Sequence, residues 1–403
     1  MAVGAVLEPF VAVTLLLGGV WVTRRDRPGA LDDTTEASSK RSDESVRWSV
    51  EWPSLHSSCE NQPTRQSVWS SAAQETSWAP PRRRTLRFFG CFETTVTTPN
   101  TLIFKDRPLS RVLQRFPFVV EACYLVLLYW LGRAYLALTL VEDTVQVARR
   151  HALQVIRFEQ QLHIFGEVPV QEFFLRSPTL LRWINRIYSF IHIPSSILSL
   201  VVLFYLTTTT QRRRQQQQQQ HAGPALYQAR RRTLAASNLL AFVVFTLWPC
   251  MPPRLLSDPG YDGPGAAEAK SFGFVDTVHG AHSEASVWTS NKFCNQYAAM
   301  PSLHCGYALL IGVTVATYPL SGPHSATTWK RLSMVAFGLT YPALILTAVV
   351  ATANHFILDA VAGALVCGVA WYCNEMLLNL CVLEDYFLWM LRIHKPASGA
   401  GTD

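Results

Sequence analysis

Two short motifs place ionisable side chains at the edges of apolar segments of this chain. The first, Ala-Met-Pro-Ser-Leu-His-Cys-Gly, occupies residues 299–306 and contains Ser302 and His304. The second, Asn-His-Phe-Ile-Leu-Asp, contains His355 and Asp359. An ionisable group at the edge of a bilayer is costly, so both motifs are candidate functional sites. Histidine, serine and aspartate are residue types that acid–base and nucleophilic chemistry requires.

The spacing of His355 and Asp359 predicts a cooperating pair. They lie four positions apart, so a helix places them on one face. A carboxylate that accepts the proton of one imidazole nitrogen fixes the tautomer and leaves the other nitrogen free as a nucleophile or base. A histidine–aspartate pair with a purely local role is the alternative for this spacing alone. Gly363 continues the same face and allows a neighbouring helix to approach closely.

Ser302 and His304 lie at the predicted start of a different helix. A serine hydroxyl and the free amides of a helix N-terminus form a ready phosphate site, although such a serine can also act only as a helix cap. A phosphate site needs positive charge, and we expect it from Arg254 and, as a second candidate, from Lys292. An interfacial arginine without this role is the alternative for Arg254.

The combined residues favour phosphoryl transfer. His355 is the candidate nucleophile, Asp359 the residue that orients it, and His304 the general acid. Two histidines and a carboxylate can also form a metal-binding facial triad. The sequence contains neither an HxH nor an HExxH element, so we expect no metal or other cofactor.

The composition favours an integral membrane protein. Hydrophobic residues make up 49% of the 403 residues and charged residues 16%. The formal net charge is +7, but the basic residues fall mainly in loops between apolar runs, as positive-inside sorting places them, so we expect no nucleic-acid partner. Seven apolar segments are candidates for membrane spans. They are residues 3–23, 117–140, 184–206, 234–250, 302–319, 333–352 and 355–382.

Loop charge predicts the orientation of these spans. The basic loops are expected in the cytosol, which puts the corners before His304 and His355 together on the opposite face. The first segment, residues 1–23, is expected to be a retained span, because its positive charges follow the apolar run rather than precede it. The glutamine run and the long polar segment suggest a eukaryotic endomembrane protein of the Golgi or endoplasmic reticulum with a luminal site.

The remaining segments are predicted to lie outside the membrane domain. Residues 24–100 are expected to form a disordered cytosolic segment, residues 211–233 a low-complexity loop, and residues 383–403 a cytosolic tail. Between the second and third candidate spans, residues 148–169 have apolar positions at helical spacing, namely Ala152, Ile156, Leu162 and Phe165. This pattern predicts an amphipathic helix along the interface.

These motifs resemble those of the type 2 phosphatidic acid phosphatase superfamily, and more closely its inositol phosphorylceramide synthase-like branch, over residues 117–382. Residues 301–304, Pro-Ser-Leu-His, are similar to the second motif of that branch, and residues 355–359 to the third. Residues 162–167, 252–255 and 273–277 resemble accessory blocks of related membrane proteins.

The resemblance implies an all-α, polytopic bundle with a six-span core plus one N-terminal span. It implies an integral membrane lipid phosphotransferase or phosphatase, inositolphosphotransferase-like, with a membrane phospholipid substrate and ceramide or another alcohol as acceptor. His355 would attack phosphorus and carry a phosphohistidine, Asp359 would orient it, and His304 would protonate the departing alcohol. Ser302 and nearby amides would hold the equatorial oxygens.

Two departures from the superfamily pattern bear on the reaction. The lysine expected before Arg-Pro in the first motif is missing, and Arg254 follows prolines instead. The arginine expected shortly before His355 is also missing, since residues 350–354 are Val-Ala-Thr-Ala-Asn. The phosphotransferase branch shares this second absence, which favours transfer over hydrolysis. The alternatives are a non-catalytic lipid-binding or lipid-moving protein on the same fold and, third, a vanadium haloperoxidase.

Overall fold

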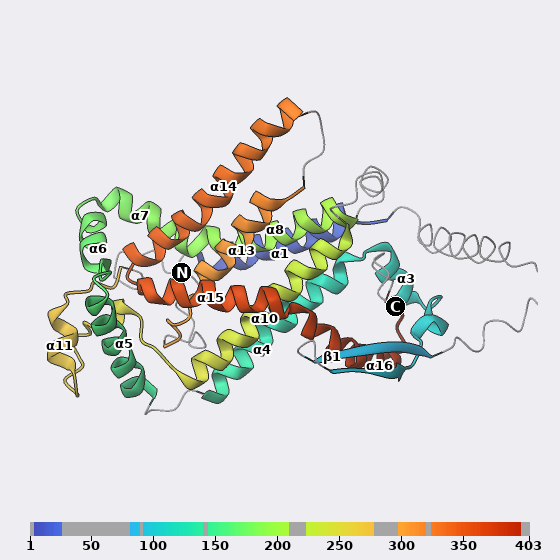
Figure 1. Cartoon of the computed structure of the whole chain (residues 1–403), viewed down its shortest axis with the longest axis horizontal. Coiled ribbons are helices and arrows are strands. Elements are labelled where there is room, and N and C mark those ends of the chain that lie inside the picture. The colour runs from blue at the N-terminus through green and yellow to red at the C-terminus, as the bar shows by residue number, and fades with distance from the viewer. Residues whose placement is uncertain are drawn as a thin grey trace, which may run out of the picture. The chain divides into compact units, whose positions relative to one another are not determined.

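The computed structural model of the protein describes residues 4–25, 81–88, 92–139, 144–208, 223–277, 297–319 and 324–395 (Figure 1). The chain divides into two compact units. The first consists of residues 1–23 and 118–378, and the second of residues 24–117 and 379–403. His304, His355 and Asp359 all belong to the first unit, which therefore contains the candidate site.

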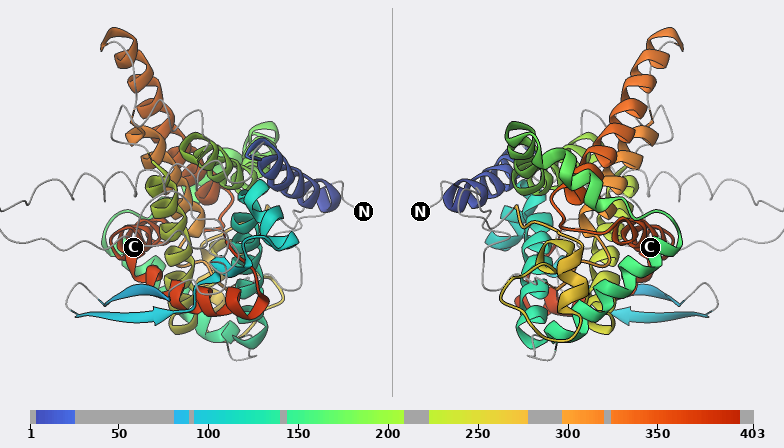
Figure 2. Two further views of the ribbon diagram at one scale, coloured as in Figure 1. Left: turned by 90° about the vertical axis from the view of Figure 1, so that its right-hand side faces the viewer. Right: turned by 90° about the vertical axis from the view of Figure 1, so that its left-hand side faces the viewer.

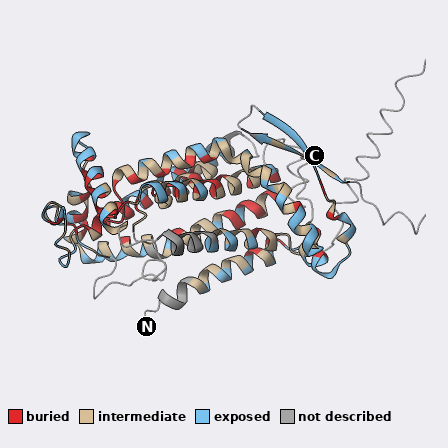
Figure 3. Cartoon of the chain, turned by 90° about the horizontal axis from the view of Figure 1, so that it is seen from below, coloured by how far each residue is buried: buried red, intermediate tan, exposed pale blue. Residues whose placement is uncertain are grey.

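The first unit is built from helices, as the predicted fold class requires. Each of the seven apolar segments overlaps a helix, and buried positions alternate with exposed ones along these helices (Figure 3). The α-helices of this unit are α1 (Gly4–Val22), α4 (Phe118–Thr139), α5 (Thr144–Gln161), α6 (Glu167–Leu175), α7 (Pro178–Arg186), α8 (His192–Thr208), α10 (Pro224–Leu247), α11 (Ala266–Ser271), α13 (Leu303–Thr317), α14 (His324–Ala351) and α15 (Ile357–Cys373). Shorter turns are η2 (Ile187–Ile191, a π-helix), η3 (Pro253–Leu255) and η4 (Asn374–Leu380).

The helices indicate an integral membrane protein, but they do not confirm a six-span core. Thr328–Ala351 and Ile357–Leu391 are long and apolar enough to cross a membrane, and the bent pair Pro108–Arg115 and Phe118–Trp130 is a third candidate. Other apolar helices of the described residues are shorter. With 15 residues, α13 covers about 22 Å, against a hydrocarbon core of about 30 Å. Length and composition therefore support two or three spans.

Glycines bring α13 into close contact with α15. α13 packs against both α14 and α15 (Figures 1 and 2). A Cβ atom at Gly363 would overlap the backbone carbonyl of Ser302, and one at Gly306 would lie 3.0 Å from the carbonyl oxygen of Gly363. The backbone N–H of Ser302 donates to the carbonyl oxygen of Asp359 at 2.8 Å. The close approach predicted from Gly363 is confirmed, and it joins the two histidine motifs.

The helix predicted within residues 148–169 is present as α5, but it ends at Gln161. Ala152 and Ile156 are fully buried, whereas Leu162 follows the helix end and is exposed. The buried face of α5 belongs to one core cluster with the chain around the candidate site. That cluster includes Ala148, Leu153, Cys250, Met251, Leu256, Phe274, Ala299, Ala353 and Phe356.

α10 begins earlier than the span predicted at residues 234–250. Its first turns occupy residues 224–233, which were expected to be part of the low-complexity loop, whereas residues 209–222 lie outside the described residues. The helix can include three consecutive arginines because each has a partner on a neighbouring element. Arg230 lies 3.4 Å from the ring centre of Trp371, Arg231 contacts Glu121 at 2.7 Å, and Arg232 donates to Asn374 at 3.1 Å.

The second unit contains an antiparallel hairpin of β1 (Arg82–Phe88) and β2 (Phe92–Thr98). It lies within the segment expected to be disordered, of which residues 26–80 are outside the described residues. Five consecutive β-branched residues, 94–98, favour the strand conformation. Asp385 accepts hydrogen bonds from Arg84 at 2.9 Å and Thr98 at 2.8 Å. Asp385 lies on α16 (Cys381–Leu391), so the predicted tail begins inside a helix; η1 (Thr101–Phe104) and α3 (Pro108–Arg115) complete the unit.

The close contact at Gly363 predicts that adding one methyl group at this position lowers the stability of the protein. Gly363→Ala is expected to destabilise the protein by about 1–3 kcal/mol, because α13 must move away from α15 to admit the Cβ atom. Thermal unfolding of the purified protein in detergent measures this. Gly368→Ala on the same helix is the matched control, since nothing lies within 4 Å of its Cβ position. Equal unfolding temperatures for the two variants would contradict the packing described.

Candidate functional site

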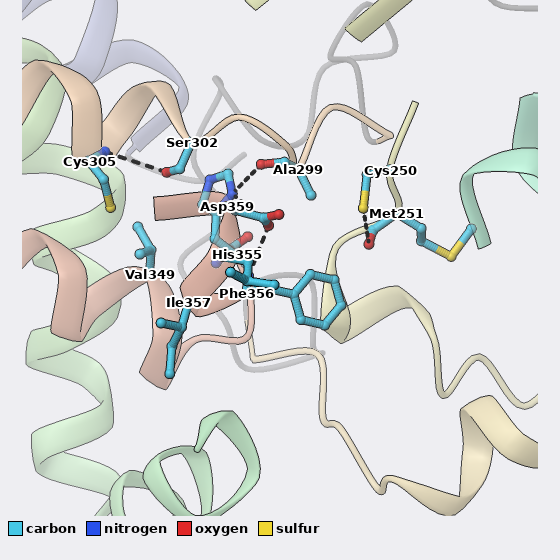
Figure 4. Close-up of polar contacts among 12 residues, drawn as sticks. Cys250, Met251, Ala299, Ser302, Cys305, Val349, His355, Phe356, Ile357 and Asp359 are labelled. Atoms are coloured by element: carbon cyan, nitrogen blue, oxygen red, sulfur yellow. Dashed lines mark hydrogen bonds and ion pairs between the residues drawn. The ribbon is translucent and has the colours of Figure 1, made fainter. Parts of the chain in front are cut away.

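His355 lies in a short connection between α14 and α15. α14 ends at Ala351, and Ala353 just beyond it lies in the left-handed region at φ 51°. The N–H of Asn354 donates back to the carbonyl oxygen of Val349 at 2.9 Å. α15 then begins at Ile357. Ala353, Asn354 and His355 are all buried. The turn therefore aims the His355 ring into the protein rather than into solvent (Figure 4).

The closest partner of the His355 ring is a backbone carbonyl. Nδ1 of His355 lies 2.7 Å from the carbonyl oxygen of Ala299 (Figure 4). A carbonyl oxygen only accepts hydrogen bonds, so Nδ1 must carry the proton. Nε2 of the neutral ring then retains its lone pair. The ring is held in the tautomer that a nucleophile at Nε2 requires.

Asp359 is near His355, as expected, but it is not the closest partner. Its Oδ2 lies 3.5 Å from Nδ1 of His355. The same oxygen accepts the backbone N–H of Phe356 at 2.9 Å, at the start of α15. The carboxylate is fully buried. Asp359 thus fixes the first turn of the helix and places a negative charge beside the Nδ1–H group, while Ala299 accepts the shorter hydrogen bond.

His304 lies next to His355, although the two residues come from different helices. The centres of their rings are 5.5 Å apart. This proximity agrees with the predicted orientation, which put both histidines on one side of the membrane. His304 lies in the first turn of α13, where α13 packs against α15. The close contact at Gly363 and Gly306 therefore brings the two rings together.

A third histidine, which the sequence analysis did not include, completes a row of rings. His192 is buried at the start of α8, and its ring centre lies 4.9 Å from that of His304. Tyr188 flanks His304 at the same distance, and the hydroxyl of Tyr341 lies 3.4 Å from Nδ1 of His192. The signal in the sequence was a histidine followed by Ile-Pro within an apolar run. In the structure, His192 directly follows the π-helical turn η2, and such turns are frequent at functional sites.

Ser302 is the N-cap of α13 and is fully buried. Its hydroxyl oxygen accepts the N–H of Cys305 at 3.4 Å, so the capping role considered for this serine is present (Figure 4). The amides of Leu303 and His304 belong to the first turn, where an α-helix offers them no carbonyl partner. The start of α13 therefore directs N–H groups and a hydroxyl at the edge of the site.

Arg254 brings positive charge to the connection before His355. Its Nε donates to Oδ1 of Asn354 at 2.8 Å, and its backbone N–H donates to the carbonyl oxygen of Ala353 at 2.9 Å. Asn354 is itself oriented, because its Nδ2 donates to the hydroxyl of Thr352 at 2.7 Å. Arg254 therefore lies beside the connection where the sequence lacks an arginine just before His355, and Asn354 and Thr352 form the link.

The guanidinium of Arg254 also contacts Asp276 at 3.4 Å. Asp276 belongs to the accessory block 273–277. Two amide side chains, one from α6 and one from α7, form hydrogen bonds with the backbone of this block. Gln171 of α6 exchanges two hydrogen bonds with Val275, and Asn185 of α7 donates to the carbonyl oxygen of Thr277. Lys292, the second candidate cation, lies outside the described residues.

Residues of α5 and α6 complete the surroundings of the site. Glu167 lies in the accessory block 162–167, whereas Glu159 and Arg149 were not among the predicted site residues. The carboxylates of Glu159 and Glu167 accept the backbone N–H groups of Leu358 and Ile357, each at 2.8 Å. Arg149 donates to the carbonyl oxygen of Leu256 at 2.8 Å, and burial lowers the pKa of its guanidinium. α5 therefore supports both the start of α15 and the turn that contains Arg254.

The metal alternative predicts a cluster of ligating side chains. Within the described ranges, no group of three or more histidine, cysteine, aspartate and glutamate side chains is arranged to hold a metal ion. His304, His355 and Asp359 are close together, but Asp359 and Nδ1 of His355 are engaged with each other and with backbone groups.

The geometry at His355 predicts a single tautomer. In protein labelled with 15N at histidine, we expect the ring of His355 to carry its proton on Nδ1, because the carbonyl oxygen of Ala299 accepts from that atom. Solid-state NMR near pH 8 measures the two ring nitrogens, and His355→Gln assigns the signals by their loss. A proton on Nε2 would contradict the arrangement.

Comparison with known proteins identifies one family whose model matches part of the chain. No curated protein and no solved structure matches the chain. The family model of the PAP2 superfamily matches residues 221–373. That segment contains Arg254, Ser302, His304, His355 and Asp359, but not α5 and α6. The match and the site together support assignment of this segment to the PAP2 superfamily, whose members are generally phosphatases or phosphotransferases.

Proposed function

We propose that this integral membrane protein transfers or hydrolyses the phosphorylated headgroup of a phospholipid through a phosphohistidine at His355. The observation that carries this proposal is the hydrogen bond between Nδ1 of His355 and the carbonyl oxygen of Ala299 at 2.7 Å. It leaves the Nε2 lone pair available for attack on phosphorus. The neighbouring ring of His304, with centres 5.5 Å apart, provides the second group that such a reaction needs.

The proposed reaction has two steps. Nε2 of His355 attacks phosphorus, the bond from phosphorus to the lipid oxygen breaks, and protonated His304 gives its proton to the departing oxygen. The headgroup phosphate is then bonded to His355, and diacylglycerol is free when the substrate is a diacyl lipid. In the second step His304 takes a proton from water or an alcohol, whose oxygen attacks phosphorus and releases His355.

The phosphate would lie at the start of α13 rather than at the start of α15. The first amides of α15 already donate to carboxylates, since Phe356 donates to Asp359 and the next two amides to Glu167 and Glu159. The amides at the start of α13, the hydroxyl of Ser302 and the guanidinium of Arg254 are the complementary groups. Lys292 is a further candidate for the same role.

Charge favours a phosphodiester substrate over a phosphomonoester. Among the described residues, Arg254 is the cation that contacts the connection before His355, and Asp276 already shares its charge at 3.4 Å. A phosphomonoester carries close to two negative charges near neutral pH, whereas a diester carries one. This balance supports a phosphodiester donor. The proposed activity is inositolphosphotransferase-like, with phosphatidylinositol as donor, ceramide as acceptor and no metal ion. A six-span core in an endomembrane, with the site facing the lumen, is part of the same proposal.

The first test is transfer by the purified protein in mixed micelles. With phosphatidylinositol labelled with 32P and ceramide, we expect a new phospholipid, matched diacylglycerol and label on the protein that survives base but not acid. His355→Ala should abolish all three, because it removes the attacking nitrogen. His163→Asn is the control, since His163 is exposed and its φ of 59° suits asparagine.

Three other outcomes of this test would favour a different function or mechanism. Free phosphate from phosphatidic acid without transfer would assign hydrolysis instead. Full turnover in His355→Ala would reject the phosphohistidine. Lipid movement that persists in the double variant His304→Ala, His355→Ala, with no turnover of either lipid by the wild type, would instead support the non-catalytic alternative.

The second test separates the two histidines by the leaving group. His304→Ala should lower turnover of the lipid by about 10²–10⁴-fold, because the departing alkoxide then lacks a proton donor. A phosphodiester with a nitrophenol leaving group needs no such proton, so its turnover should fall less than tenfold. His355→Ala should lose both substrates alike. Equal losses of the two substrates in His304→Ala would exclude its role as general acid.

A further inference from the structure

Two carboxylates from outside the histidine motifs meet at the first turn of α15. Glu159, near the end of α5, accepts the N–H of Leu358 through Oε1 at 2.8 Å. Glu167, at the start of α6, accepts the N–H of Ile357 through its own Oε1 at 2.8 Å. Both side chains are fully buried. We refer to Glu159 and Glu167 as the carboxyl pair.

The second oxygens of the carboxyl pair lack partners. Oε2 of Glu159 and Oε2 of Glu167 are buried and accept no hydrogen bond from a donor in the described residues. Their Oε1 atoms accept from consecutive amides, so the two carboxyl groups meet at one turn of α15. Two neighbouring carboxylates in a dry site cannot both ionise at low cost, and a proton held between them satisfies both unpartnered oxygens. The pair then has one negative charge, which suits a helix N-terminus.

The electrostatics of the pair support one bound proton near neutral pH. Burial, followed by the hydrogen bond to Glu167, raises the pKa of Glu159 to about 9. The other titratable groups that face Glu159 are Asp359 on α15 and the thiol of Cys250. Burial raises the pKa of Cys250 well above its usual value, so that thiol stays neutral in the same range and does not compete for the role.

We propose that Glu159 and Glu167 are positioning residues that share one proton, and that the singly charged pair fixes the first turn of α15 and with it the orientation of His355 and Asp359. The catalytic consequence rests on the proposed role of His355, whereas the shared proton and the fixed turn do not. Glutamine at position 159 can replace the protonated acid, because its oxygen accepts from Leu358 and its amide group donates to Glu167.

The direct test is the pH dependence of thermal unfolding. A group whose pKa is higher in the folded protein contributes its full stability below the unfolded value of about 4.5. That contribution declines as the pH rises from about 4.5 towards 9. The unfolding temperature of the wild type should therefore fall relative to Glu159→Gln, by roughly 2–4 °C per pH unit between pH 5 and 8. Glu172→Gln on α6 is the control, since Glu172 is exposed.

Two further measurements keep the structural and catalytic parts separate. Infrared spectroscopy at pH 7 should show the carbonyl stretch of a protonated carboxylic acid in the wild type and its loss in Glu159→Gln. Hydrogen exchange in the peptide containing Ile357 and Leu358 should stay slow in Glu159→Gln and accelerate at least tenfold in Glu159→Ala. Neither readout requires turnover, so both remain informative if no lipid substrate is found.

Turnover then tests the positioning role. Glu159→Gln should keep phosphotransfer within about threefold of the wild type near pH 7, and the ratio of its turnover to that of the wild type should rise at pH 9–10, where the wild type loses its shared proton. Glu159→Ala should lose about 10²-fold. A pH-independent difference in unfolding temperature between the wild type and Glu159→Gln would overturn the shared proton. Equal loss of turnover in Glu159→Gln and Glu159→Ala, with slow amide exchange in the former, would overturn the positioning role.

Discussion

The connection between α14 and α15 has to satisfy an irregular backbone in a buried position. An unpaired N–H or carbonyl group there would cost as much as a lost hydrogen bond, so each group needs a partner from elsewhere in the chain. The amides of residues 356–358 are paired with Asp359, Glu167 and Glu159, and the carbonyl oxygen of Ala353 with Arg254. The groups that fix this backbone are also those that surround His355.

This arrangement separates opposite charges across His355, the proposed nucleophile. Carboxylates gather at the start of α15, where the positive end of the helix dipole stabilises them. Arg254 lies on the other side of the connection, joined to it through Asn354. The imidazole of His355 keeps its proton on the acidic side, where Ala299 and Asp359 face Nδ1. The lone pair of Nε2 therefore remains for the proposed anionic substrate, which the acidic groups would repel and the guanidinium would attract.

The sequence was sufficient to select the motif histidines, Asp359 and Arg254 as candidate site residues, because they are polar residues at the ends of apolar segments. Their close approach could be predicted in part from Gly363. The contribution of Ala299 could not, because a backbone carbonyl is the same in every residue type. The contacts of Glu159 and Glu167 could not be predicted either, although Glu167 lies in the accessory block 162–167, since 199 and 190 residues separate the two glutamates from their amide partners. The early start of α10 could not be predicted from local hydropathy, because it depends on aromatic and polar residues of other elements that contact its arginines.

The proposed substrate-binding residues and the residues that support them lie in different segments of the chain, and this limits how short an active fragment can be. Residues 221–373 contain every side chain proposed to touch the substrate, yet the acceptors for the amides of Ile357 and Leu358 come from α5 and α6. A fragment cut to the matched segment would lack α5, expose the core residues that the buried face of α5 covers, and leave two amides without acceptors. An autonomous piece of this protein must therefore begin no later than α5, well upstream of the residues proposed to do the chemistry.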